Sequence, residues 1–157
     1  MEKEAGKPSE NPKRDRDLEA RQMYRLDFTL SSNDPKTTVP QGAFTMNLLE
    51  DQMGLLSTGR SVVLAAATTS DKQGIGTGNA RADVGLVLRE SFRMVGDDLL
   101  MTSDTELSGV EDGGAIRKLS ANDQALVTPG KSTLVSSIDD GTSHKHYQVM
   151  VTATKLR

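Results

Sequence analysis

The chain has 157 residues, a formal net charge of −3, 35% hydrophobic and 3% aromatic residues, and no cysteine. The lack of cysteine excludes a disulfide framework, a thiolate nucleophile and cysteine-ligated zinc or iron–sulfur. Basic residues dominate no segment, which argues against non-specific nucleic-acid binding because phosphate neutralisation needs clustered positive charge. The length suits one domain and a tail.

The sequence predicts no membrane-spanning helix, since no segment approaches the roughly 18 to 20 apolar residues that a span needs. The first residues also lack the apolar core of a signal peptide. If the protein is exported, we expect the printed chain to begin after cleavage or at an engineered Met1.

Residues 1–22 form a charged tail in which basic and acidic residues balance. Its first half contains Pro8 and Pro12 and has too little apolar surface to offset the entropy of ordering. Its second half could form a short helix. Two interpretations stay open: a flexible linker, or an arm that docks on a neighbouring subunit. The domain proper is expected over 23–157.

Strand patterning starts at Tyr24. Apolar and polar residues alternate over 24–30 and again over 44–48, which predicts two strands with one buried face each. Residues 31–40 read as a loop. Residues 50–54 read as a turn, although 47–53 could alternatively form a helical turn.

The middle of the chain predicts a long β-hairpin over 81–107, with its turn at Gly96-Asp97-Asp98. Before it, a third strand is expected over 55–67, broken at Thr58-Gly59. Residues 68–79 read as a glycine-containing loop. Its glycine spacing and the strand that follows do not fit a dinucleotide fingerprint, which needs a helix after the glycines.

The last third of the chain predicts short strands separated by turns. The expected segments are a loop at 108–115, a strand pair or one irregular strand at 116–127 with a possible turn at 121–123, a turn at 128–131, a short strand at 134–138, a turn at 139–143 and a final strand at 146–156. Together the segments predict an all-β fold, an antiparallel β-sandwich or open barrel of about seven to nine strands with an extended N-terminal arm.

Candidate chemistry is sparse. His144 and His146 are two residues apart on a predicted strand and could share a metal, with Asp139 or Asp140 as a third ligand. Ser136 and Ser137 lie near His144 in sequence, but the chain has no G-x-S-x-G elbow. The alternative for His144, His146, Asp139 and Asp140 is that they are ordinary surface residues beside a turn. The sequence supports no catalytic residue and no cofactor.

Acidic residues are plentiful in the predicted turns. They are Asp97, Asp98, Asp104, Glu106, Glu111, Asp112, Asp139 and Asp140. Such residues could bind calcium or hydrolyse glycans. However, aspartate is also ordinary turn chemistry, the chain has no tryptophan to line a glycan site, and no EF-hand spacing is present. The seven methionines are better explained as core residues.

Two resemblances follow from these strands. The segment ADVGLVLRESFRMVGDDLLMTSDTELSGV at 82–110 resembles a strand pair of the secretin domain of bacterial secretion channels, and TPGKSTLVSSIDD at 128–140 is similar to a later secretin segment. The order RLDF, DVG-x-x-L, TPGK, SSIDD and YQV-x-VTATK also resembles a set of uncharacterised exported bacterial β-proteins. The chain lacks the paired glycine, the VPLLGDIP-like segment and the long membrane hairpins of secretins, which argues against a pore-forming channel. The resemblance implies an envelope or extracellular setting and a tendency to form homo-oligomers.

The leading hypothesis is therefore a non-enzymatic, exported structural module, periplasmic or extracellular, that self-assembles into a ring or filament through β-edge and arm contacts. Its expected partners are copies of itself, with envelope or secretion-machine proteins as further candidates. One alternative is a carbohydrate- or calcium-binding module or glycan hydrolase that uses the acidic turns. Another is an accessory protein of a secretion or pilus machine.

Overall fold

The computed structural model describes residues 20–36, 41–63, 81–111 and 113–157. Within these ranges the chain forms eight strands and no helix. The strands are β1 (Met23–Ser32), β2 (Gly42–Leu49), β3 (Met53–Val63), β4 (Arg81–Val95), β5 (Asp98–Val110), β6 (Ile116–Val127), β7 (Thr133–Asp140) and β8 (Lys145–Lys155). Residues 1–19 of the predicted N-terminal arm, residues 64–67 of the predicted third strand and the whole predicted 68–79 loop lie outside the described residues.

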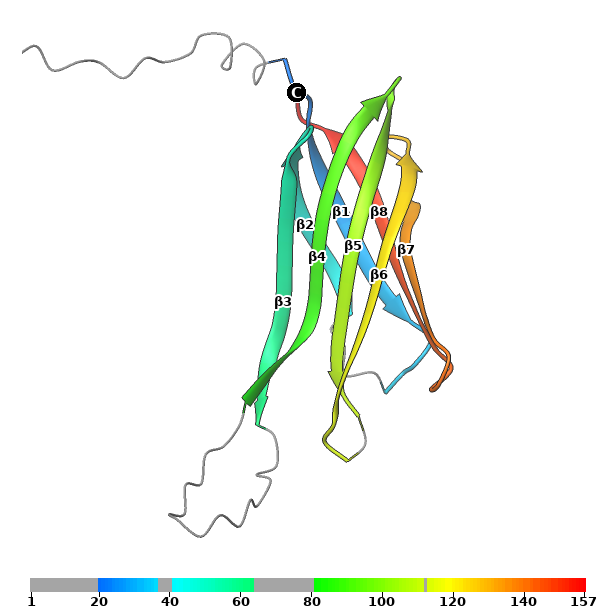
Figure 1. Cartoon of the computed structure of the whole chain (residues 1–157). Coiled ribbons are helices and arrows are strands. Elements are labelled where there is room, and N and C mark those ends of the chain that lie inside the picture. Colours follow the sequence, from blue (N-terminus) through cyan, green and yellow to red (C-terminus); the bar gives the residue numbers. More distant parts are fainter. Residues whose placement is uncertain (1–19, 37–40, 64–80, 112) are drawn as a thin grey trace, which may run out of the picture.

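Two four-stranded antiparallel sheets face each other (Figure 1). One sheet has the order β2-β1-β8-β7 and the other has the order β3-β4-β5-β6. The chain passes from the first sheet to the second between β2 and β3, and returns between β6 and β7. The prediction of an antiparallel sandwich is confirmed.

The core lies between the sheets and follows the period-two pattern of the strands. On β4, Leu86, Leu88 and Phe92 are buried, while Arg89 lies on the opposite face and pairs with Asp104. The apolar core consists of Tyr24, Leu26, Phe28, Leu30, Met46, Leu48, Leu86, Leu88, Phe92, Leu99, Met101, Leu107, Val127, Val135, Ile138, Tyr147, Val149, Val151 and Ala153. Each large side chain buried in this way contributes roughly 1.5–3 kcal/mol.

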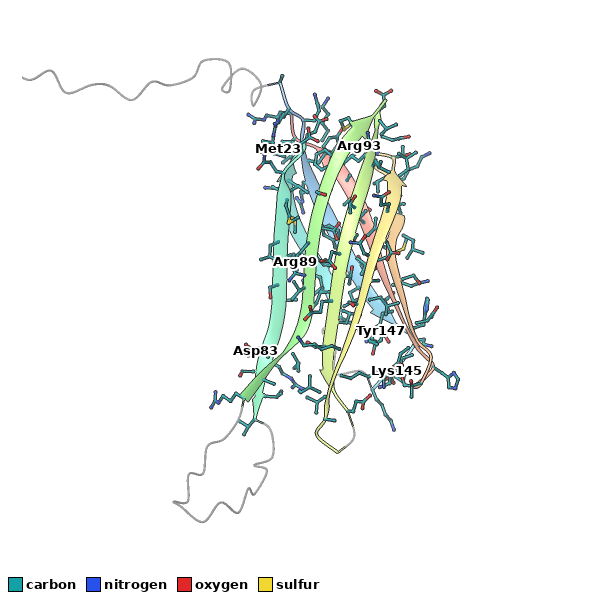
Figure 2. The ribbon with its side chains drawn as sticks, in the orientation of Figure 1. Met23, Asp83, Arg89, Arg93, Lys145 and Tyr147 are labelled. Atoms are coloured by element: carbon teal, nitrogen blue, oxygen red, sulfur yellow. The ribbon has the colours of Figure 1, made fainter. Side chains whose placement is uncertain are left out.

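The sandwich has two distinct ends (Figure 2). Met23 and Arg93 lie at one end, which also holds the β4–β5 turn. Asp83, Lys145 and Tyr147 lie toward the other end, which also holds the β7–β8 turn. Near the first end, the rings of Tyr24 and Phe92 join the two sheets edge to face, with centroids 5.5 Å apart.

The predicted break of the third strand is wrong. β3 runs continuously through Thr58 and Gly59 and pairs with β4 at both positions. Gly59 lies directly opposite Gly85, and a Cβ at either position would overlap backbone atoms of the other strand. Here glycine allows two strands to approach closely and does not interrupt one. The helical alternative for 47–53 is also wrong, because β2 ends at Leu49 and β3 begins at Met53.

Three predicted turns or loops are instead strand. β6 is one unbroken strand, and its residues 121–123 pair with Thr105, Asp104 and Ser103 of β5. β5 extends to Val110 because residues 108–110 pair with 116–118, so the predicted 108–115 loop starts later. β7 extends through Asp139 and Asp140, which pair with β8. In each case a partner strand satisfies the backbone, and this overrides the local turn preference of Asn and Asp.

Candidate functional site

The histidine and aspartate candidates gather at the β7–β8 end without converging. Asp139 and His146 are cross-strand partners, and His146 Nδ1 contacts Asp139 Oδ1. His144 is exposed in the turn with φ of 56°, and its carbonyl accepts a hydrogen bond from Asn33 Nδ2 at 3.3 Å. Asp140 instead lies on the inner face of β7 and is buried.

The Asp140 carboxylate links the β7–β8 turn to β6 of the other sheet. It accepts hydrogen bonds from the Ser143 hydroxyl at 2.5 Å and the Thr142 backbone N–H at 3.1 Å, and it pairs with Arg117 of β6. The Ser143 hydrogen bond, with the backbone donors and the Arg117 charge, keeps the pKa of Asp140 below its ordinary value. Its oxygens are thus committed to structural contacts.

The described part of the chain holds no group of three or more His, Cys, Asp or Glu side chains placed to share a metal ion. The structure brings His146 to Asp139 but directs Asp140 to Arg117. The assignment of a metal to these four residues stays a prediction.

The two candidate serines point to opposite faces of β7. A β-bulge between Leu134 and Ser136 shifts the register, so that Val135 and Ser136 are both buried while Ser137 is exposed. Bulges commonly redirect a side chain in this way. The Ser136 hydroxyl donates to Asp123 Oδ2 at 2.8 Å and so links β7 to β6 of the other sheet. The Ser136 hydroxyl is therefore used in a structural contact between the two sheets.

Besides Asp140, three of the eight acidic residues proposed for glycan or calcium chemistry form ion pairs with arginine or lysine, and Asp112 lies outside the described residues. Asp104 pairs with Arg89 at 3.3 Å, and Glu106 pairs with Lys118 at 3.1 Å. Glu111 pairs with Arg117 at 3.0 Å. These contacts are cross-strand or near-turn ion pairs, which are typical of a solvated sheet surface.

Sequence reasoning missed a row of polar side chains on the inner face of the second sheet. Glu90 of β4 lies opposite Ser103 of β5, which in turn lies opposite Asp123 of β6. The Ser103 hydroxyl donates to Glu90 Oε1 at 2.6 Å and lies 3.5 Å from Thr105 Oγ1. We call Glu90, Ser103, Thr105 and Asp123 the inner polar row.

Glu90 is fully buried, and its Oε2 has no hydrogen-bond partner among the described residues. Burial, together with the nearby charge of Asp104, raises the pKa of Glu90 to about 7, against the opposing effect of the Ser103 hydrogen bond. The sequence contains a hint that Glu90 is buried, because it lies at the same alternating positions as Leu86, Leu88 and Phe92.

The second feature of the second sheet is its two long edges. β3 has 11 residues and β6 has 12, and neither contains proline. β3 exposes Met53 (74%), Leu55 (65%) and Val63 (56%), and β6 exposes Leu126 (52%). Long edges with exposed apolar side chains present unpaired backbone groups to other strands.

Near the start of β4, the backbone pairing between β4 and β5 is lost while that between β3 and β4 continues. β4 pairs with β3 from Arg81 onward, but with β5 only from Gly85 onward. Gly85 has φ of +153° and donates its N–H to Ser108 Oγ at 3.0 Å. A cleft of about 400 Å³ lies where this pairing is lost, and its charged lining residues are Arg60, Asp83, Glu106 and Lys118. Both signs of charge are present, so the cleft selects neither an anion nor a cation.

Comparison with solved structures shows that this two-sheet fold is similar to that of secretins. The type II secretin GspD of enteropathogenic Escherichia coli matches with a TM-score of 0.51 at 11% identity, over 87% of this chain and 66% of that chain. The fold is secretin-like. The Salmonella type III secretion injectisome secretin InvG matches with a TM-score of 0.49 at 11% identity, over 87% of this chain and 64% of that chain. This chain therefore spans just under two thirds of the GspD chain.

No family model matches the sequence, and no curated protein matches it. The resemblance to the secretin domain is confirmed at the level of fold. The resemblance to exported bacterial β-proteins stays a prediction. In the described ranges no helix is long and apolar enough to cross a membrane.

Proposed function

We propose that this chain is a non-enzymatic structural module of a secretion-related assembly in the bacterial cell envelope, and that copies of it join edge to edge through β3 and β6. The observation that carries the proposal is that the two edge strands of one sheet, β3 and β6, are long and expose apolar side chains. The likeness to the fold of a type II secretin supports the setting.

Strand direction favours this joint. The second sheet has four strands and every neighbouring pair is antiparallel, so β3 and β6 run in opposite directions. If a second copy is related to the first by rotation about an axis along the strands, its β3 runs antiparallel to β6 of the first. The contact is heterologous, and it generates a ring if the rotation closes and a filament if it does not.

Side-chain exposure favours the same joint. Leu55 on β3 and Leu126 on β6 are both about half exposed or more in the single chain. A new strand pair would cover part of this apolar area and satisfy the edge backbone groups at the same time. The charged segment 1–22 is proposed to act as an arm on the neighbouring subunit.

Mass photometry of the full chain across the micromolar range tests the proposal. The parent should form defined oligomers. Leu55→Lys and Leu126→Lys should each shift the distribution to monomer, because an edge charge opposes strand addition. Thr154→Lys is the matched control, since Thr154 is exposed on the interior strand β8. A parent that is monomeric at all concentrations would contradict the proposal.

A further inference from the structure

Two carboxylates are buried in the described part of the chain, and they differ in their partners. Asp140 has the Arg117 guanidinium beside it. Glu90 has the Ser103 hydroxyl on one oxygen and no described partner on the other. An ionised carboxylate without a cation is costly in a protein interior, whereas a neutral one costs far less.

The groups that face Glu90 offer no compensating charge. On β3 the opposite residue is Gly54, and on β5 it is Ser103. The charged groups nearest in register are Arg89 and Asp104, which form an ion pair on the outer face, and Asp123 farther along the inner polar row. Of these, the charge of Asp104 contributes to the raised pKa of Glu90.

The facing sheet adds no cation either. The buried residues of β2, β1 and β8 are apolar or aromatic, and Tyr24 and Tyr147 are the titratable ones among them. β7 contributes Ser136, which is already bound to Asp123. The inward cation of β6, Arg117, is held by Glu111 and Asp140, six positions along the strand from Asp123.

On the β2/β3 side, the residues next to Glu90 are Gly54, its cross-strand partner, and Met46, which packs over Gly54. Gly54 belongs to an edge strand and has no side chain to cover its neighbour. The space above Gly54 is filled by the thioether of Met46, with Leu48 beside it. Methionine is a flexible side chain that can move aside.

We propose that Glu90 is a pH-responsive lock on the β2/β3 side of the sandwich. Uncharged Glu90 stays buried between the sheets and keeps β3 closed on the core. Ionised Glu90 draws water past Gly54 and Met46 and loosens the edge strand. The lock is a property of the single chain and does not depend on assembly.

The direction of the pH effect follows from proton binding. The folded chain binds the Glu90 proton with a pKa of about 7, against an ordinary value of 4.5. The stabilisation is therefore fully present below about pH 4.5 and is lost as the pH rises through about 7. With these two values, the unfolding equilibrium constant should rise about 70-fold between pH 5 and pH 8 because of this one group.

The test is denaturant unfolding of the full chain at pH 5 and pH 8, with hydrogen exchange of the β3 amides measured in parallel against those of β8. In the parent, unfolding should become more favourable at pH 8, and protection of β3 should fall relative to β8 after correction for intrinsic exchange. Glu90→Gln keeps the shape without the titration and should remove most of both effects. Asp123→Asn changes another carboxylate of the same row and should leave them in place.

Carboxyl NMR of the unmodified chain provides a readout that no substitution can disturb. A glutamate that titrates near pH 7 supports the lock. Ordinary titration of every glutamate would overturn it, as would an unfolding constant and β3 protection that do not change between pH 5 and pH 8. A Glu90→Gln variant that folds and keeps the full pH dependence would overturn it as well.

Discussion

The two sheets share one core but are built differently. The interior strands of the first sheet, β1 and β8, bury only apolar and aromatic side chains, and its edge strands have 8 residues each. The interior strands of the second sheet bury Glu90, Ser103, Thr105 and Ser108, and its edges have 11 and 12 residues. Apart from Ser136 and Asp140 on its edge strand β7, the first sheet buries apolar and aromatic side chains, while the second holds the other buried polar groups and the long edges. The long edges and the buried carboxylate without a cation thus lie in the same layer.

The largest expected effect comes from a charge placed in the shared core. Leu86→Asp should abolish folding, because Leu86 is fully buried and an unpaired charge there costs several kcal/mol. Arg89→Asp, three positions along β4, should leave the fold intact and cost about 1 kcal/mol, since the lost ion pair with Asp104 is partly exposed. Circular dichroism melts compare the two, and equal melting of both variants with the parent would show that the faces are misassigned.

A smaller loss is expected where β3 and β4 approach closely. Gly85→Ala should destabilise the chain by about 1–3 kcal/mol, because the new Cβ meets the Thr58 backbone and φ is positive. Gly141→Ala has open space and should stay within about 0.5 kcal/mol of the parent. Urea unfolding measures both. A neutral Gly85→Ala would mean that the two strands lie farther apart.

The buried carboxylates of the two sheets should respond to pH in opposite directions. The pKa of Asp140 is lowered, so its stabilisation is present at neutral pH and is lost as the pH falls below its ordinary value of 3.8. Asp140→Asn should therefore weaken the fold at pH 7 and reduce the further loss on acidification. Thermal melts between pH 2.5 and pH 7 provide the check, and an unchanged acid profile would count against the Arg117–Asp140–Ser143 contact.

The smallest expected effect concerns the surface of the first sheet. Asp27 accepts hydrogen bonds from Thr45 at 2.8 Å and Arg25 at 3.0 Å on its exposed face. Asp27→Asn should leave stability close to that of the parent, because exposed pairs contribute little. A loss as large as that of Gly85→Ala in the same urea series would show that this face is covered.

Much of the fold was predictable because most strands alternate cleanly. The pattern of Tyr24, Leu26 and Phe28 is enough to place β1 and its buried face. The sequence does not reveal that Thr58-Gly59 continues a strand, because the reason is a glycine 26 positions later on β4. The residues Asp139-Asp140-Gly141 predict a turn by local preference. They do not reveal that Asp140 pairs with β8 and meets Arg117, which is distant in sequence.

The candidate site was harder to predict than the fold. Glu90 breaks an apolar pattern, and a pattern alone does not tell whether such a residue is buried or bulges outward. The edge role of β3 and β6 depends on strand order, which emerges only when the sheets are formed. Both features are tertiary, and local propensity contains little information about them.

Disulfide cross-linking tests the central claim most directly, because the chain has no cysteine of its own. Leu55→Cys on β3 would be combined in turn with Ser120→Cys, Asn122→Cys and Gln124→Cys on β6, which scans the unknown register of the joint. The account predicts a ladder of cross-linked oligomers for at least one double variant, and no such ladder for either single variant. Dimers formed by Leu55→Cys alone would reveal a symmetric β3–β3 contact and contradict the account, as would monomers for all the double variants.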